Sequence, residues 1–206
     1  MIISYKHKFI YIKLAKVAGT STEYFLEPFC DDNDVVTRCF PVESKSHRPR
    51  NYQNIGNNGA RIRGHMTAGQ LFKLIPYEKF KNYKFVANER NSWDRAVSFY
   101  NMAIYRNETK KEFASWLQTH PDKTLSSRVI YNGKNIITDW IRFRHLHTDL
   151  IKFCKSINID CDNHSLAHAK KYQKKHYTEY YDDETRQIVA EKYAKDIEYF
   201  GYKFGE

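Results

Sequence analysis

The chain contains little glycine, proline and cysteine. Its 206 residues include 8 Gly, 5 Pro and 4 Cys. So few glycines and prolines exclude collagen-like, linker-like and turn-dense architectures. No stretch approaches the ~18 apolar residues that a membrane-spanning helix needs, and we find no internal repeat or low-complexity tract. The sequence is therefore typical of an ordinary folded protein and not of a fibrous or repetitive one.

The N-terminal segment also lacks the apolar core of a signal peptide. Lys6, His7, Lys8 and Lys13 interrupt residues 1–14 well short of the ~7 to 15 apolar residues that such a core needs. We therefore expect a cytoplasmic protein without a membrane span. The cysteines of such a protein are expected to be reduced rather than joined in disulfides. They are Cys30, Cys39, Cys154 and Cys161.

Aromatic residues and positive charge, by contrast, are abundant. Aromatics make up 16% of the chain and hydrophobic residues 41%, which excludes a disordered chain of low hydrophobicity. The length predicts one domain over residues 1–206, large enough for a real core. The 34 Lys and Arg exceed the 24 Asp and Glu, which gives a net charge of +10. This excess predicts an anionic partner, whether nucleic acid, a phosphorylated small molecule, an acidic polysaccharide or a membrane surface.

The hydrophobic pattern changes its period several times, as it does in α/β domains. It predicts two strand–loop–helix units: a strand over 8–14 with a helix over 22–29, and a strand over 83–87 with a helix over 92–105. We therefore expect a three-layer α/β domain with a central, mainly parallel sheet flanked by helices. Further helices are expected over 67–75, 112–119, 146–157 and 183–200, a turn over 131–134, and a long surface loop over 41–64.

The loop after the first predicted strand has the composition of a phosphate-binding loop. It contains Lys16, Val17, Ala18, Gly19, Thr20 and Ser21. Backbone N–H groups and the helix dipole attract anions at such a helix start, and a small residue lets a phosphate approach. The Walker A motif is nevertheless absent, because the lysine precedes the only glycine. The loop is P-loop-like without being Walker A, and the alternative is an ordinary capped helix with a surface lysine.

A second candidate anion site follows the second predicted strand. Arg90 stands at the carboxyl end of that strand, where open α/β sheets bind ligands, and its planar guanidinium can hold a phosphate through two hydrogen bonds. Ser98, about two turns into the next helix, is placed to present its hydroxyl to the same anion. Arg95 has two interpretations, a further phosphate ligand or an ion pair with Asp94. A single arginine in a loop is otherwise typical of a solvated surface.

The two motifs, in this order and spacing, resemble those of sulfotransferases that use 3′-phosphoadenosine 5′-phosphosulfate (PAPS), and in particular the carbohydrate sulfotransferases of the heparan and chondroitin type. Residues 15–21 are similar to the family's Pro-Lys-Thr-Gly-Gly-Thr-Ser. Residues 89–100 are similar to its Val-Arg-Asn-Pro-Trp-Asp-Arg-Ala-Val-Ser-Phe-Tyr. Residues 193–202 resemble its closing Tyr-x-x-Asp-Ile-x-x-Phe-Gly-Tyr. The resemblance therefore covers nearly the whole chain.

The resemblance implies transfer of a sulfuryl group from PAPS to a hydroxyl of a carbohydrate or similar acceptor. Residues 16–21 would bind the 5′-phosphosulfate, with Lys16 stabilising the departing phosphate and the bridging oxygen. Arg90 and Ser98 would bind the 3′-phosphate. Sulfuryl transfer resembles phosphoryl transfer in depending on alignment and charge. No metal ion is expected.

The acceptor hydroxyl must lose its proton, so a base is needed within hydrogen-bond reach of it. His65 lies between the two motifs, just before a predicted helix, and the family often places its base in such a segment. The alternative for His65 is a helix cap or a surface residue. Residues 166–172 match a basic family loop that closes over the nucleotide. Lys170 or Lys171 would then touch the nucleotide, unless this charge run is simply solvated.

The chain departs from the family pattern at three positions. Ala15 and Ser92 replace prolines, which loosens the loop geometry. Arg144 stands where a carboxylate is common, which puts any role inherited at that position in doubt and is consistent with a different acceptor. We expect an anionic saccharide acceptor, held by basic residues in or beside the 41–64 loop. These are Lys45, His47, Arg48, Arg50, Arg61 and Arg63.

Three other interpretations compete with this one. A nucleic-acid-binding module would suit the charge and the basic aromatic segment 170–181, but the basic residues are spread over the chain and no recognition motif is present. A nucleotide kinase of related fold would need a Walker A motif and an acidic Mg²⁺ site. A zinc site would use widely spaced ligands, with a first gap too long for a zinc knuckle. Its ligands would be Cys154, Cys161, His164 and His168.

Overall fold

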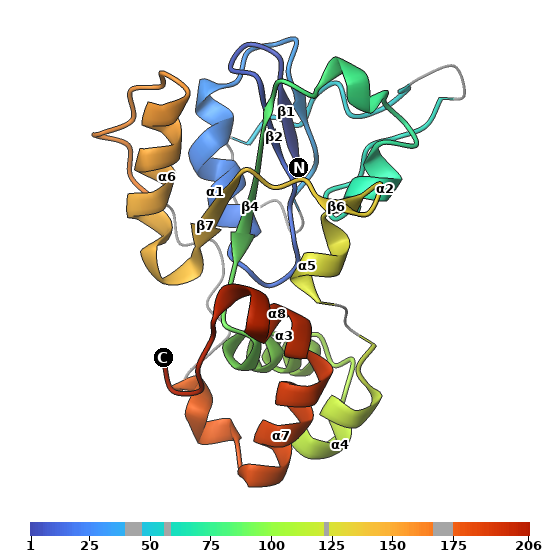
Figure 1. The fold of residues 1–206 in the computed structure, drawn as a ribbon, viewed down its shortest axis with the longest axis vertical. Helices are drawn as coiled ribbons and strands as arrows, with labels where there is room; N and C mark the ends of the chain where they lie inside the picture. The colour runs from blue at the N-terminus through green and yellow to red at the C-terminus, as the bar shows by residue number, and fades with distance from the viewer. Residues whose placement is uncertain (40–46, 56–58, 122–123, 167–174) are drawn as a thin grey trace. The chain divides into compact units, whose positions relative to one another are not determined.

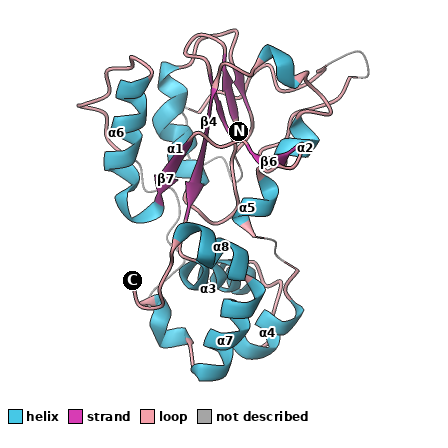
Figure 2. Ribbon diagram, viewed as in Figure 1, coloured by secondary structure: helices cyan, strands magenta, loops and turns pink. Residues whose placement is uncertain are grey.

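The computed structural model describes residues 1–39, 47–55, 59–121, 124–166 and 175–206 (Figure 1). The chain divides into two compact units, which we call unit 1 and unit 2. Unit 1 contains Met1–Glu89 and Arg128–Ala169, and unit 2 contains Arg90–Ser127 and Lys170–Glu206. Figure 2 shows that the described strands belong to unit 1, whereas the described part of unit 2 is built from helices and loops.

Unit 1 is built on a five-stranded sheet in the order β3-β1-β2-β4-β7. Strands β2, β4 and β7 run parallel, whereas β1 is antiparallel to β2 and to β3. The predicted α/β class is therefore confirmed, with a mixed sheet whose core is parallel. The strands are β1 (Ile2–Ser4), β2 (Phe9–Tyr11), β3 (Val35–Val36), β4 (Lys84–Glu89) and β7 (Asp139–Arg142).

Helices flank this sheet, as predicted (Figure 1). One face packs against α1 (Gly19–Leu26) and α6 (Leu146–Ser156). Phe9 of β2, for example, meets Phe153 of α6 edge to face, with ring centroids 5.5 Å apart. Because side chains alternate along a strand, the neighbouring residues point to the opposite face. There Phe85 of β4 contacts Phe72, which directly follows α2 (Ala68–Leu71).

Short elements complete unit 1. Asn132 and Gly133 both have positive φ, at 49° and 75°, which is the geometry of the two-residue hairpin turn that Asn-Gly favours. The predicted turn is thus confirmed, between β5 (Ile130–Tyr131) and β6 (Lys134–Asn135). The 3₁₀ helices are η1 (Glu27–Phe29), η2 (Tyr77–Lys79) and η3 (Phe143–His145).

In unit 2 the helix predicted over 92–105 forms with those boundaries. The helix predicted over 183–200 is interrupted, because Tyr193 leaves the helical conformation (φ −114°, ψ 21°). Beyond the break, the buried carboxylate of Asp196 accepts hydrogen bonds from the backbone N–H groups of Leu125 and Ser126. The helices are α3 (Ser92–Tyr105), α4 (Phe113–Thr119), α5 (Leu125–Arg128, whose last residue belongs to unit 1), η4 (Tyr177–Tyr180), α7 (Asp183–Lys192) and α8 (Ala194–Phe200).

The start of α3 places Ser92 at the first position of the helix. Asn91 caps the helix, accepting a hydrogen bond from Trp93 N–H at 3.1 Å, so Ser92 is its first residue. The Ser92 hydroxyl is buried and has no hydrogen-bond partner among the described residues. A polar atom buried without a partner costs stability. The serine is thus tolerated at this position rather than required by its contacts.

We predict that Ser92→Pro stabilises the protein by about 0.5–1 kcal/mol. Proline suits the first position of a helix, and Asn91, with ψ of 129°, already lies outside the α region that a following proline disfavours. Thermal or urea unfolding measures the change. A matched control is Trp93→Pro, one position further in, which should destabilise the protein. A loss of stability in Ser92→Pro would contradict this account of the helix start.

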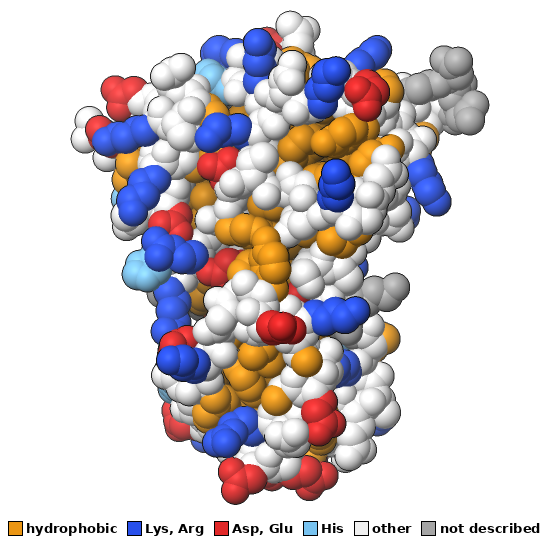
Figure 3. All heavy atoms as spheres, viewed as in Figure 1, with side chains coloured by type: hydrophobic (Ala, Val, Ile, Leu, Met, Phe, Trp, Pro, Cys, Tyr) orange, Lys and Arg blue, Asp and Glu red, His pale blue; other side chains and the backbone are white. Residues whose placement is uncertain are grey.

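Three further observations concern the charged surface, the lengths of the helices and the cysteines. On the face drawn in Figure 3, Lys and Arg side chains are interspersed with acidic and apolar ones and do not form a single patch. Within the described ranges, no helix is long and apolar enough to cross a membrane. All four cysteines are buried free thiols.

Candidate functional site

The loop between β2 and α1 has an unusual backbone. Lys16 and Ala18 both adopt the left-handed conformation, with φ of 64° and 63°, which non-glycine residues seldom do. Left-handed residues in such a loop turn successive N–H groups toward one side and form concave anion sites. Strain of this kind is typical of functional sites. The loop that the sequence predicts to bind an anion therefore contains two left-handed residues.

Helix α1 begins at Gly19, three residues earlier than predicted, so Thr20 and Ser21 lie in its first turn and not before it. Within the described part of the chain, no side chain caps this helix, whose N-cap residue is Ala18. An uncapped helix start presents backbone N–H groups and the positive end of the dipole to an anion. Val17 is buried, whereas Lys16 is partly exposed.

Gly19 packs against side chains beneath the loop. A Cβ atom built on Gly19 would lie 2.8 Å from Lys13 Cγ and 3.1 Å from Tyr11 Oη. A glycine is needed here because these two buried residues occupy the space of any side chain. The sequence predicts a small residue here because a phosphate must approach the loop, and packing against Lys13 and Tyr11 is a second requirement for glycine.

We predict that Gly19→Ala destabilises the protein by about 1–3 kcal/mol, the usual cost of forcing an extra methyl group into a packed interior. The control is Gly69→Ala in α2, where an added Cβ meets nothing within 4 Å and the higher helix propensity of alanine should be neutral or stabilising. Thermal melting of both variants gives the comparison. Equal melting temperatures would refute the close packing beneath the loop.

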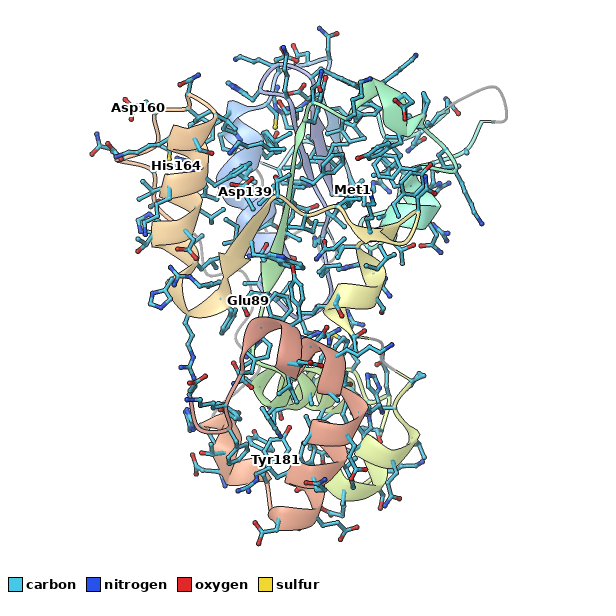
Figure 4. The ribbon with its side chains drawn as sticks, in the orientation of Figure 1. Met1, Glu89, Asp139, Asp160, His164 and Tyr181 are labelled. Atoms are coloured by element: carbon cyan, nitrogen blue, oxygen red, sulfur yellow. The ribbon has the colours of Figure 1, made fainter. Side chains whose placement is uncertain are left out.

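Lys13 is part of a buried polar cluster under this loop. It is 4% exposed and Glu23 is 0% exposed, and its ammonium pairs with the Glu23 carboxylate. Glu23 also pairs with the amino group of Met1, which is labelled in Figure 4, and accepts a hydrogen bond from Cys39 Sγ at 2.7 Å. Burial raises the pKa of Glu23, but the ammonium groups of Met1 and Lys13 outweigh it and lower the pKa to about 2. Glu23 is therefore ionised at neutral pH.

A second network fixes α1 to the sheet. Tyr11 Oη donates to Asn88 Oδ1 at 2.7 Å, and Asn88 Nδ2 donates to Thr22 Oγ1 at 2.9 Å. These residues belong to β2, β4 and α1 and are fully buried. Because a buried polar network is stable only when its members are satisfied, it holds the helix start in one position over the sheet. The loop 16–21 is thus attached to a rigid base.

His65 lies in a turn just before α2 and contacts the same cluster. Its Nδ1 is 3.2 Å from the carbonyl oxygen of Lys13. A carbonyl can only accept, so Nδ1 carries the proton and Nε2 keeps its lone pair. Nε2 has no hydrogen-bond partner among the described residues, and the residue as a whole is exposed. This tautomer is the one that a general base requires.

The environment of His65 also favours its neutral form. Desolvation of the ring edge that faces the cluster, together with the positive charge of Lys13, lowers the pKa of His65 to about 4. The imidazole is therefore unprotonated at neutral pH. The guanidinium of Arg128 donates to the His65 carbonyl oxygen at 2.7 Å, which fixes the backbone of this turn. Arg128 contributes to the site without a sequence signal that would have identified it.

In unit 2, Arg90 is held by an acidic neighbour. It is 8% exposed, and its Nε and Nη2 each donate to a carboxylate oxygen of Asp94 at 2.8 Å. Arg95 is 1% exposed, and its guanidinium lies over the rings of Phe99 and Tyr193, at 5.2 and 5.8 Å. Both interpretations of Arg95, as a phosphate ligand and as an ion-pair partner, stay predictions.

Ser98 lies on α3 and is 8% exposed. Residues four apart share one face of a helix, so Ser98 follows Asp94 on the face where Asp94 holds Arg90. Asp94 thus bonds Arg90 directly and precedes Ser98 by one helical turn. In unit 1 both Gly19 of the loop and His65 contact Lys13. Glu89, labelled in Figure 4, ends β4 and directly precedes Arg90.

Several other predicted residues have different roles or lie elsewhere. Arg50 is structural, because its guanidinium bonds Glu27 at 2.7 Å and the carbonyl oxygens of Cys30 and Asp31; its predicted contact with an acidic sugar is not available to those nitrogens. Arg144 is exposed in η3. Residues 40–46, 56–58 and 167–174, which include Lys45, His168, Lys170 and Lys171, lie outside the described residues.

The zinc interpretation gains no support. Among the described residues, no group of three or more His, Cys, Asp or Glu is placed to hold a metal ion. Cys154 and Cys161 lie in the hydrophobic core of unit 1. The His164 ring packs against Phe25 and Phe29, with centroids 4.9 and 5.1 Å away. His164, labelled in Figure 4, is therefore accounted for by packing.

Comparison with known proteins identified no similar protein. Neither the protein-family models, nor the curated proteins, nor the solved structures gave a match to the chain.

Proposed function

We propose that this protein is a PAPS-dependent sulfotransferase with a P-loop-like fold, acting on a hydroxyl of an anionic saccharide or similar acceptor. The observation that carries the proposal is in unit 1. A left-handed loop at an uncapped helix start and a neutral imidazole with a lone pair on Nε2 are both anchored on Lys13. An anion-binding loop and a base fixed on one residue suit the transfer of an anionic group to a hydroxyl.

The residues have distinct roles in the proposed reaction. His65 Nε2 accepts the proton of the acceptor hydroxyl as its oxygen attacks sulfur. The bond between sulfur and the bridging oxygen breaks, so the 5′-phosphate leaves as part of adenosine 3′,5′-bisphosphate (PAP). Lys16 and the N–H groups of residues 17–21 stabilise the charge that develops on the bridging oxygen. The products are a sulfate ester, PAP and one proton held by His65.

Unit 2 supplies the proposed selectivity for a 3′-phosphate. Asp94 holds the guanidinium of Arg90 through two hydrogen bonds, so less side-chain entropy is lost when Arg90 binds an anion. Ser98 adds a hydroxyl donor on the same helix face. This part of the proposal rests on the resemblance of residues 89–100 to the family motif.

The preference for an anionic acceptor rests on arginines near His65. Arg38, Arg61 and Arg63 are exposed. Arg63 is two residues from His65, and the backbone oxygen of Arg38 lies 3.8 Å from a Cβ built on Gly64. Exposed arginines beside the base are suited to carboxylate or sulfate groups of a sugar. These arginines replace Arg50 as the proposed ligands of the acceptor, because the Arg50 guanidinium is hydrogen-bonded to Glu27 and to backbone carbonyl oxygens.

The nucleic-acid alternative is weakened by the packing of the aromatic segment that motivated it. Tyr177 is 2% exposed, and the Tyr181 ring packs against Phe204 at 5.4 Å while its hydroxyl donates to the Trp93 carbonyl oxygen. Aromatic side chains that stack on bases need exposed faces. These two rings are instead part of the interior of unit 2.

The transfer assay tests the proposal. The protein is incubated with donor carrying labelled sulfate and with a panel of neutral, carboxylated and sulfated saccharides, and both labelled saccharide and PAP are measured. We expect one PAP for each sulfate transferred, with the highest rate on an anionic saccharide. Phosphate transfer from ATP to the same saccharides, with none from the sulfate donor, would support the kinase alternative instead.

A further inference from the structure

Lys13 connects the two parts of the proposed site in unit 1. Its backbone carbonyl accepts the hydrogen bond from His65 Nδ1 at 3.2 Å. Its aliphatic chain lies under Gly19, at 2.8 Å from the position of a Cβ there. Its ammonium pairs with Glu23 of α1, the helix whose start forms the anion-binding loop. One residue thus touches the base, the loop and the helix behind the loop.

A lysine at this position is costly by itself. Removing an ammonium and a carboxylate from water carries a large desolvation penalty, and a buried ion pair is often no more stabilising than an apolar pair of similar volume. Lys13 is 4% exposed and Glu23 is 0% exposed. An apolar pair in place of both Lys13 and Glu23 would serve packing as well, so the presence of the charged pair as a whole is not explained by stability.

We propose that Lys13 is a positioning residue, which orients the imidazole of His65 through its carbonyl and sets the electrostatic environment of that imidazole through its buried ammonium. The catalytic importance of Lys13 rests on the proposed function. Its effect on the orientation and the protonation of His65 does not. Lys13 lies outside the motifs that the family resemblance covers.

The charges around His65 determine the direction in which each substitution should shift the pKa of its imidazole. Lys13 and the amino group of Met1 disfavour the imidazolium, whereas the Glu23 carboxylate favours it. Arg128 contacts the carbonyl of His65 and not its ring. Removing the charge of Lys13 must therefore raise the pKa of His65, and removing the charge of Glu23 must lower it. A pair whose charges do not act on the imidazole predicts no such opposition.

The direct experiment is an NMR titration of the His65 imidazole in the full chain, in wild type, Lys13→Met and Glu23→Gln. We expect the midpoint of Lys13→Met above that of wild type and that of Glu23→Gln below it. Lys13→Arg, which keeps the charge, should return the midpoint toward the wild-type value. Lys6→Met, which removes an exposed lysine of unit 1, is the matched control and should leave the midpoint unchanged.

Two results would overturn the inference. One is a midpoint for His65 that is the same in wild type, Lys13→Met and Glu23→Gln. The other is a shift in the same direction in both variants, which would indicate a general loosening of the cluster. If Lys13→Met does not fold, Lys13→Gln supplies the neutral replacement, and Glu23→Gln tests the opposite sign independently.

A kinetic measurement then connects the inference with catalysis. Because the base must be unprotonated, kcat should rise with pH through the pKa of His65 and remain level above it. In Lys13→Met that acidic limb should move to higher pH in parallel with the NMR midpoint, and Lys13→Arg should reverse the change. Absence of transfer in the wild type would refute the proposed function and leave the NMR result standing, so the two failures can be distinguished.

Discussion

Replacing His65 with alanine is expected to lower kcat for sulfuryl transfer by about 10²- to 10⁴-fold, the usual contribution of a general base, while the affinity for PAP stays within about twofold. The physical reason is the tautomer, because Nδ1 is engaged with the Lys13 carbonyl and only Nε2 is available to the acceptor. Transfer assays stopped at fixed times give kcat, and calorimetric titration with PAP gives the affinity.

His7→Ala is the matched control for this variant. The His7 ring also contacts a backbone carbonyl, that of Phe29, at 3.1 Å and in unit 1. It should therefore lose a comparable hydrogen bond without loss of activity. If His65→Ala loses PAP binding together with activity, His65 is a structural residue and the assignment of the base is wrong.

Replacing Arg90 with alanine is expected to remove most of the preference for PAP over adenosine 5′-monophosphate, which lacks the 3′-phosphate. Hydrogen bonds to charged groups contribute roughly 1.5–3 kcal/mol, which corresponds to a loss of about 10- to 150-fold in the affinity for PAP. The affinity for the monophosphate should change little. Titration of both nucleotides into both proteins gives the ratio.

Arg106→Ala is the control for charge, because Arg106 follows α3 in the same unit and is about half exposed. It removes one positive charge without touching Asp94. Arg90→Lys is the second variant, because it keeps a positive charge opposite Asp94 and protects the fold. It should recover part of the preference, since lysine cannot hold the phosphate through a planar fork. An unchanged ratio in Arg90→Ala would contradict the assignment of Arg90 as a ligand of the 3′-phosphate.

The sequence predicted those elements whose ends carry strong local signals. Helix α3 has the predicted boundaries because Asn91 is a good cap and Asp94 complements the helix dipole. The hairpin at residues 131–134 was predictable because Asn-Gly favours two residues with positive φ. The short strands β1, β3 and β7 were not predicted, since two to four residues show no periodicity.

The break at Tyr193 was missed for a related reason. The apolar spacing of residues 183–200 continues across it, so the pattern gives no sign that the backbone changes direction. The departure depends on tertiary packing, because Tyr193 is 2% exposed and Asp196 caps α5 from the far side of the break. Such contacts join residues about seventy positions apart and leave no local signal.

The motifs of the candidate site could be recognised in the sequence, but the residues that support them could not. The loop 16–21, His65, Arg90 and Ser98 were identified from sequence. In the sequence Lys13 appears only as an interruption of an apolar run, although it lies under the loop and its carbonyl accepts a hydrogen bond from His65. A buried lysine cannot be distinguished from an exposed one by periodicity alone, because its burial depends on Glu23 ten residues later.

The central claim is that this protein binds a nucleotide with a 3′-phosphate for sulfuryl transfer. The most direct test is a binding measurement that needs no acceptor. Calorimetric titration of the wild-type chain with PAP, adenosine 5′-monophosphate and ATP compares their affinities at one ionic strength. We predict that PAP binds at least about tenfold more tightly than either of the others, by the same charge-assisted hydrogen bonds. Equal affinity for PAP and ATP would contradict the account.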